Sequence, residues 1–181
     1  MRPTSKSPSL LLLGVLLVLL ATSASAQRAG CQDQKPDGSV IGLVAADEPG
    51  EPLVVIGRAV DGDGQPLAGV KVRVFHTDAE GYYSAGGMDE SKSRLCGVLE
   101  TATDGGYRIE TILPGEYATG GPRPHIHFDT ELPGGGTRFF TVHWSGIEEG
   151  GDPAAGERGA STRPIVRDGE SLHLVYDLVF R

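Results

Sequence analysis

The feature that most constrains the fold is a series of short apolar runs, rich in β-branched residues, separated by Gly, Asp and Pro. The last run is the clearest, because every second residue from Leu172 to Phe180 is a large apolar or aromatic one. A strand repeats every two residues, so these side chains share one face. After residue 26 no segment of useful length has a helical period, and the 27 Gly and 12 Pro suit frequent turns. The sequence therefore predicts an all-β domain with strands at 53–60, 70–77, 107–112, 125–130, 137–144 and 172–180.

The first 26 residues have the pattern of a secretory signal peptide. Arg2 and Lys6 precede an apolar run at 10–20, and Ala24-Ser25-Ala26 is a small-residue cleavage site. The run is too short to cross a membrane, so no membrane span is expected. The protein is therefore expected to be secreted, or to reside in the periplasm or cell envelope. We expect residues 27–50 to form an irregular N-terminal arm, and residues 51–181 the domain, with a Gly-rich acidic excursion at 145–170.

The charge restricts the partners that the protein is expected to bind, and the cysteine content indicates a disulfide. The chain has 24 acidic and 16 basic residues, a net charge of −8. An acidic surface disfavours a nucleic-acid partner, whose phosphates require basic residues, and adhesion to anionic membranes. Cys31 and Cys96 are an even pair behind a signal peptide, which in an oxidising compartment predicts a disulfide.

The stretch with the most chemical content is Pro124-His125-Ile126-His127-Phe128. Two His at positions i and i+2 of a strand project from the same face, so both imidazoles can reach one metal ion. Two unrelated polar residues on a solvated face would give the same pattern. Tyr83 and Tyr117 are the flanking candidates, with Tyr82 as the alternative to Tyr83. A tyrosinate ligand needs a strongly acidic metal such as ferric iron, although each Tyr alone also fits a packing role.

Four segments occur in a recognisable order. Residues 56–70 begin Ile-Gly-Arg-Ala-Val-Asp and end Gly-Gln-Pro-Leu-Ala-Gly-Val, and residues 72–83 end in Gly-Tyr-Tyr. Residues 103–117 contain Thr-Asp-Gly-Gly-Tyr and Thr-Ile-Leu-Pro-Gly-Glu-Tyr, and residues 124–128 carry the His pair. Taken together, residues 53–145 resemble the intradiol ring-cleavage dioxygenases, the family of protocatechuate 3,4-dioxygenase and catechol 1,2-dioxygenase.

The resemblance implies a β-sandwich of the transthyretin or immunoglobulin type that cleaves a catecholic diol with O2 to a cis,cis-muconate-type diacid. It also implies a non-haem Fe(III) site with four ligands: Tyr83, Tyr117, His125 and His127. Tyr117 would be the labile ligand that leaves when the diol binds and then accepts a proton. Arg123 would reach the ring, although it lies one residue closer to the His pair than the family's Arg. Val142 stands where the family has Gln.

Other readings remain open from the residues alone. A transthyretin-like sandwich that only binds a partner explains the strands and turns without any metal. A cupin would use the His pair with Glu131, but cupins carry a second motif with Asn, and this chain contains no Asn. An Fe(II) site of His127, Asp129 and His173 fits the two-His-one-carboxylate pattern. The remaining His residues, 76 and 143, are expected to be structural or surface residues.

Overall fold

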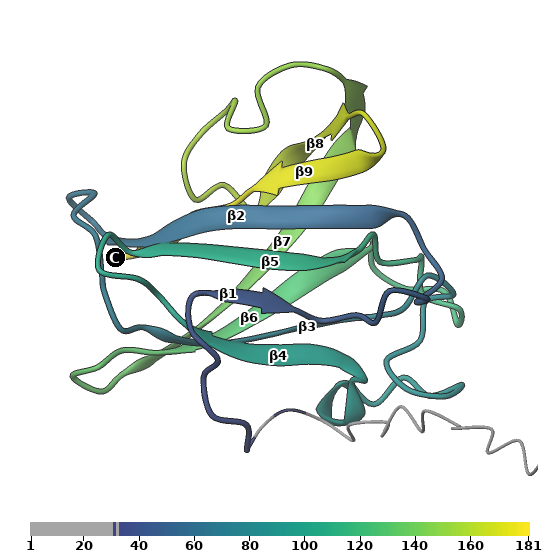
Figure 1. Cartoon of the computed structure of the whole chain (residues 1–181), viewed down its shortest axis with the longest axis horizontal. Helices are drawn as coiled ribbons and strands as arrows, with labels where there is room; N and C mark the ends of the chain where they lie inside the picture. Colours follow the sequence, from purple (N-terminus) through teal and green to yellow (C-terminus); the bar gives the residue numbers. More distant parts are fainter. Residues whose placement is uncertain (1–30, 32) are drawn as a thin grey trace, which may run out of the picture.

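Residue 31 and residues 33–181, which the computed structural model describes, form strands and one short 3-10 helix (Figure 1). The elements in chain order are β1 (Val40–Gly42), β2 (Pro52–Asp61), β3 (Lys71–His76), η1 (Glu90–Lys92), β4 (Leu95–Glu100), β5 (Gly106–Ile112), β6 (His125–Glu131), β7 (Thr137–Glu149), β8 (Thr162–Asp168), β9 (Ser171–Val175) and β10 (Leu178–Phe180). Within these residues no helix has the length and apolar character needed to span a membrane. The all-β prediction is confirmed, whereas the predicted signal peptide lies outside the described residues.

The strands form two layers that are joined along one side. Hydrogen-bonded neighbours run in the order β1-β5-β2-β9-β8-β7-β6-β3-β4, and β10 also pairs with β2. In Figure 1, β1, β5 and β2 lie in one layer, β7, β6, β3 and β4 in the other, and β8 and β9 connect them at the top. The edge strands β1 and β4 approach each other, so that Ile41 and Leu43 lie over Gly97 of β4. The predicted sandwich is thus a single sheet folded over on itself.

The core lies between the two layers and follows from the two-residue period. Val55 of β2 and Ile109 of β5 face Val72 of β3 and Phe128 of β6, and all four side chains are fully buried. Burying apolar surface in this way is the main stabilising contribution to such a fold. The opposite face of β3, β6 and β7 is free to carry the polar side chains of the site.

Three strands, β1, β4 and β8, lie where the sequence did not mark one. The predicted irregular arm contains β1, which pairs in parallel with β5 from Val40 to Gly42. The predicted excursion at 145–170 is partly sheet, because β7 continues to Glu149 and β8 runs from Thr162 to Asp168. Pro164 lies in β8 where the register with β7 shifts between Trp144 and Ile147, a position that needs no proline N–H. Only the segment between these strands is a long loop.

The C-terminal run is confirmed as a single buried face but is broken into β9 and β10. Both strands pair in parallel with β2, β9 with its first half and β10 with its second. Tyr176 lies between them, and its carbonyl approaches Gly57 so closely that a Cβ there would be 1.8 Å away. Asp177 accepts a hydrogen bond from the Arg58 backbone N–H (2.9 Å). The alternation continues through the break, since Tyr176 is also buried.

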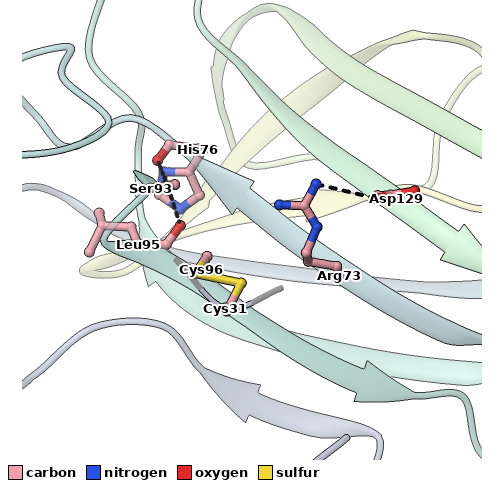
Figure 2. Close-up of a disulfide and its surroundings, with 7 residues drawn as sticks. All are labelled: Cys31, Arg73, His76, Ser93, Leu95, Cys96 and Asp129. Atoms are coloured by element: carbon pink, nitrogen blue, oxygen red, sulfur yellow. Dashed lines mark hydrogen bonds and ion pairs between the residues drawn. A yellow bond between two sulfur atoms is a disulfide. The ribbon is translucent and has the colours of Figure 1, made fainter. Parts of the chain in front are cut away.

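The predicted disulfide between Cys31 and Cys96 is present (Figure 2). Cys96 lies in β4, so the bond joins the start of the described chain to a buried strand. Its sulfurs pack in a small apolar cluster apart from the main core, with Phe75, Tyr83 and Val98. The disulfide is therefore part of the packing around one of the predicted metal ligands.

Replacing both Cys31 and Cys96 with Ala should lower the free energy of unfolding by about 4 kcal/mol, because the bond closes a loop with a sequence separation of 65 residues. Urea denaturation of the oxidised wild type and the double variant measures the difference. The reduced wild type is the control that keeps both side chains. Equal midpoints for oxidised and reduced protein would show that the bond does not contribute to stability.

Candidate metal centre

Two loops carry the tyrosines, and they cross in close backbone contact. The Gly115 N–H donates to the Asp78 carbonyl (2.9 Å), and the Ala118 N–H donates to the Gly81 carbonyl (3.4 Å). Gly81 has φ +84°, and a Cβ on it would lie 1.8 Å from the carbonyl oxygen of Glu116. Only glycine allows this approach. The crossing fixes the bases of both loops, and it thereby positions Tyr83 and Tyr117.

The crossing brings Tyr83 and Tyr117 together. Their hydroxyl oxygens are 2.6 Å apart, and their rings meet edge to face at a centroid distance of 5.8 Å. Tyr83 is fully buried, whereas Tyr117 is half-buried. The backbone of Tyr82 is instead held by Asp78, whose carboxylate accepts from the Tyr82 N–H (2.9 Å). Of the two adjacent tyrosines, it is therefore Tyr83 that joins the cluster.

The two His side chains of β6 complete a chain of donor atoms. His125 Nε2 lies 3.0 Å from Tyr117 Oη and 2.8 Å from His127 Nε2. Both imidazoles are buried. The structure thus brings together all four side chains that the sequence marked as ligands, with neighbouring oxygen and nitrogen atoms 2.6 to 3.0 Å apart.

Hydrogen bonds to the other ring nitrogens orient the two imidazoles. His125 Nδ1 lies 2.7 Å from the Arg123 carbonyl, which only accepts, so Nδ1 carries the proton and Nε2 presents a lone pair. His127 Nδ1 lies 3.1 Å from the hydroxyl of Thr141, which faces it across the β6–β7 ladder. Partners of this kind hold the tautomer and ring orientation of metal-binding His residues.

Burial sets the electrostatics of the cluster. It raises the pKa of Tyr83 well above its usual value, and the hydrogen bond with Tyr117, in which Tyr83 is the donor, and the carboxylate of Glu90 act in the same direction. It also raises the pKa of Tyr117. Burial, and then repulsion from His125 and His143, lower the pKa of His127 to about 3, so its imidazole is neutral. The neutral imidazole of His127 is a ready ligand, whereas the phenols need a strongly acidic cation to lose their protons.

The donor set fits a ferric ion. Two donors at right angles around a metal about 2.0 Å away are about 2.8 Å apart, similar to the observed separations. Two phenol oxygens and two imidazole nitrogens combine hard and borderline ligands that suit iron. Across residues 33–181, no group of three or more His, Cys, Asp or Glu could hold a metal. The structure therefore gives no support to the cupin site with Glu131 or to the triad with Asp129 and His173.

The other predicted residues have different places. The side chain of Arg123 is exposed, and its contact with the cluster is made by the backbone carbonyl. Val142 is fully buried in the main core, so the neighbouring Thr141 supplies the polar contact on β7. His76 is a buried structural residue, as expected, with its ring nitrogens 2.6 Å from the Thr77 carbonyl and 2.7 Å from the Thr111 hydroxyl.

Three residues next to the cluster were missed by sequence reasoning. Glu90 Oε1 lies 3.7 Å from His127 Nε2. The ring of Phe139, a half-exposed residue of β7, lies 5.1 Å from that of His127. His143, expected to be structural or on the surface, lies with its ring centroid 5.1 Å from that of His125. The two β7 residues follow from their two-residue spacing to Thr141, whereas nothing in the sequence marks Glu90.

Comparisons with known proteins identify related sequences and structures. A family model described as Dioxygenase matches residues 30–134. The 6-chlorohydroxyquinol 1,2-dioxygenase of Cupriavidus pinatubonensis is 35% identical over 109 residues, which are 50% of this chain and 39% of that protein. The protocatechuate 3,4-dioxygenase beta chain of Burkholderia cepacia is 30% identical over 154 residues, 73% of this chain and 65% of that protein. The chain therefore spans less than two thirds of the length of each relative.

Solved structures share the fold. The dioxygenase domain of a carbohydrate-binding protein fusion from Streptomyces sp. SirexAA-E superposes with a TM-score of 0.63 at 24% identity, over 84% of this chain and 93% of that one. Catechol 1,2-dioxygenase from Acinetobacter sp. ADP1 gives a TM-score of 0.61 at 23% identity, over 78% of this chain and 56% of that one. Since the family model covers more than half of the sequence and the relatives agree with it, the chain belongs to the intradiol ring-cleavage dioxygenase family.

Proposed function

We propose that this chain is a non-haem Fe(III) dioxygenase that opens the ring of a catecholic diol between its two hydroxyl-bearing carbons. The observation that carries the proposal is the continuous chain of four donor atoms from Tyr83 through Tyr117 and His125 to His127. Its substrates are an aromatic diol and O2, and its product is a muconate-type diacid. The names of the relatives support this reaction class.

The four residues of the cluster have two different roles, metal binding and proton transfer. Tyr83, His125 and His127 are buried and hold the metal. Tyr117 is the more exposed tyrosine, and its hydroxyl lies between the Tyr83 hydroxyl (2.6 Å) and His125 Nε2 (3.0 Å), so it would be the ligand that a bound diol displaces. Once free, its phenolate accepts a proton from the incoming diol. When bound, ferric iron supplies the Lewis acidity that lowers the pKa values of the diol hydroxyls and activates the ring toward O2.

The protein is further proposed to act in an oxidising compartment, secreted or in the periplasm or cell envelope. The Cys31–Cys96 disulfide supports this, because such bonds persist where thiols are not kept reduced. The signal-like pattern at 1–26 points to the same place.

Substituting Tyr83 or Tyr117 with Phe should shift or weaken the visible absorption of the ferric protein. The wild type is expected to bind about one iron per chain and to be reddish, because tyrosinate donates charge to ferric iron. Absorption spectra together with iron analysis measure both effects. Tyr82→Phe is the matched control and should leave the band unchanged. A ferric-loaded wild type without any visible band would contradict the proposed ligand set.

The reaction itself is tested with labelled O2. Catechol, protocatechuate, hydroxyquinol and chlorinated catechols form a suitable first panel. The expected product is a muconate-type diacid that contains both atoms of one O2 molecule, identified by mass. A yellow semialdehyde would show cleavage beside the diol and overturn the intradiol assignment. Full iron occupancy with no oxygen uptake for any diol would leave a metal-binding sandwich without this activity.

A further inference from the structure

One carboxylate lies next to the four donor atoms without belonging to them. Glu90 begins η1, its Oε1 is 3.7 Å from His127 Nε2, and its side chain is 51% exposed. Among residues 33–181, it is the one acidic side chain with an oxygen within 4 Å of a ring nitrogen of the His pair, and because the His127 imidazole is neutral this contact does not offset the charge of Glu90. Its charge therefore faces both the donor atoms and the solvent from which a diol arrives.

The short helix holds Glu90 in this place and leaves its charge uncompensated. Asp89 caps η1, and its carboxylate accepts from the Ser91 N–H (3.1 Å) and hydroxyl (2.6 Å). The ammonium of Lys92 pairs with the same carboxylate at 3.0 Å. The charges of Asp89 and Lys92 thus offset each other. Glu90 remains as the net negative charge of the helix.

Arg73, a cation on the neighbouring strand β3, already has an acidic partner. Arg73 pairs with Asp129 (3.2 Å) and lies over the ring of Phe75, 4.3 Å from its centroid. Phe75 in turn stacks on His127, and the half-exposed Phe139 lies on the same imidazole. The side of the cluster next to η1 therefore combines an aromatic surface with the Glu90 carboxylate.

We propose that Glu90 is a specificity-determining residue that disfavours aromatic diols with an anionic ring substituent and favours neutral or cationic ones. The inference rests on the proposed function, because it takes the diol to bind through its hydroxyls at the four donors. A diol bound there brings its ring to the side of the cluster that Glu90 Oε1 approaches, 3.7 Å from His127 Nε2. A unit charge at such a distance near a protein surface changes binding by roughly tenfold. Added salt reduces the effect, because Glu90 is half exposed.

The test measures binding rather than turnover. Ferric-loaded protein is titrated without oxygen with three diols. Catechol has no charged substituent, protocatechuate carries a carboxylate, and dopamine carries an ammonium. The change of the visible band gives the three dissociation constants. The variants are Glu90→Gln, Glu90→Lys and, as the matched control, Glu170→Gln, which removes the same charge from the exposed turn between β8 and β9.

In Glu90→Gln, the affinity for protocatechuate relative to catechol should rise roughly tenfold, and that for dopamine should fall by a similar factor. Glu90→Lys should enlarge both changes, and Glu170→Gln should show neither. If the affinities for protocatechuate and dopamine relative to catechol are the same in Glu90→Gln as in the wild type, while the band still responds to diols, the inference about Glu90 is overturned and the proposed function is not. Loss of iron from Glu90→Gln would make Glu90 a ligand and overturn its selective role. A wild-type band that responds to no diol would overturn the proposed function as well.

Discussion

Protein in which His125 or His127 is replaced by Ala should lose its iron and its colour. Each imidazole presents Nε2 to the other donors, and its ring is fixed by a hydrogen bond at Nδ1. Even the loss of an outer hydrogen-bonding partner typically weakens metal binding by 10- to 100-fold, so the loss of a ligand should cost about a hundredfold or more. Competition with a chelator measures the affinity, and the visible band reports the tyrosinates that remain.

The matched control for both variants is His173→Ala. His173 is a half-buried residue of β9, paired with Val54 and Val166 away from the donor cluster. This variant should keep iron and colour at the wild-type level. Thermal unfolding of the metal-free proteins separates a lost ligand from a lost fold. Wild-type iron affinity in either the His125 or the His127 variant would remove that residue from the ligand set.

Gly81→Ala is expected to be the most damaging change that leaves every donor side chain intact. Its Cβ would lie 1.8 Å from the Glu116 carbonyl oxygen and 2.8 Å from the Ala118 nitrogen, and both are backbone atoms. The two loops must then separate, which moves Tyr83 away from Tyr117. Overpacking of this kind typically costs about 1–3 kcal/mol of stability, occasionally more, and iron affinity should fall with it. Urea denaturation and chelator competition measure the two losses.

Gly86→Ala isolates the effect of the crossing from that of glycine flexibility. Gly86 lies in the same loop at φ +70°, close to the φ +84° of Gly81, but a Cβ on it would meet nothing within 4 Å. Both variants bear the strain of a positive φ, and only one meets the opposing backbone. Gly86→Ala should therefore lose about 1 kcal/mol and keep its iron. Similar iron affinities for the two variants would show that the crossing does not position the tyrosines.

The sequence predicted most of the longer strands and missed β1, β4 and β8. Burial alternates along residues 172–180 because one face of the run is buried, and this pattern survives the break between β9 and β10. In β4, by contrast, five of the six residues are buried, so no alternation marks it. β1 is three residues long and is defined by its partner β5, not by its own pattern. β8 contains Pro164, which argues against a strand unless the register shift beside it is known.

For the site, the sequence predicted the donor side chains but not the contacts around them. The His pair follows from strand periodicity, and the tyrosines follow from the family motifs. The contact between His127 and Thr141 depends on the register of β6 against β7, which local sequence does not specify. The carbonyl of Arg123 acts independently of its side chain, so residue type gives no hint of it. Glu90 reaches the cluster through a loop whose path depends on the rest of the fold.

The crossing of the two tyrosine loops separates the part of the protein that must be preserved from the part that is free to diverge. The loops are joined at their bases, between residues 78–81 and 115–118, and the donors lie next to these joins. Beyond the donors, the loop tips at 84–92 and 118–123 are largely exposed. Insertions and substitutions there leave the metal-holding atoms in place, while they change which side chains meet the substrate. In the evolution of such a fold, new substrate preferences can therefore arise in the tips without a new metal site.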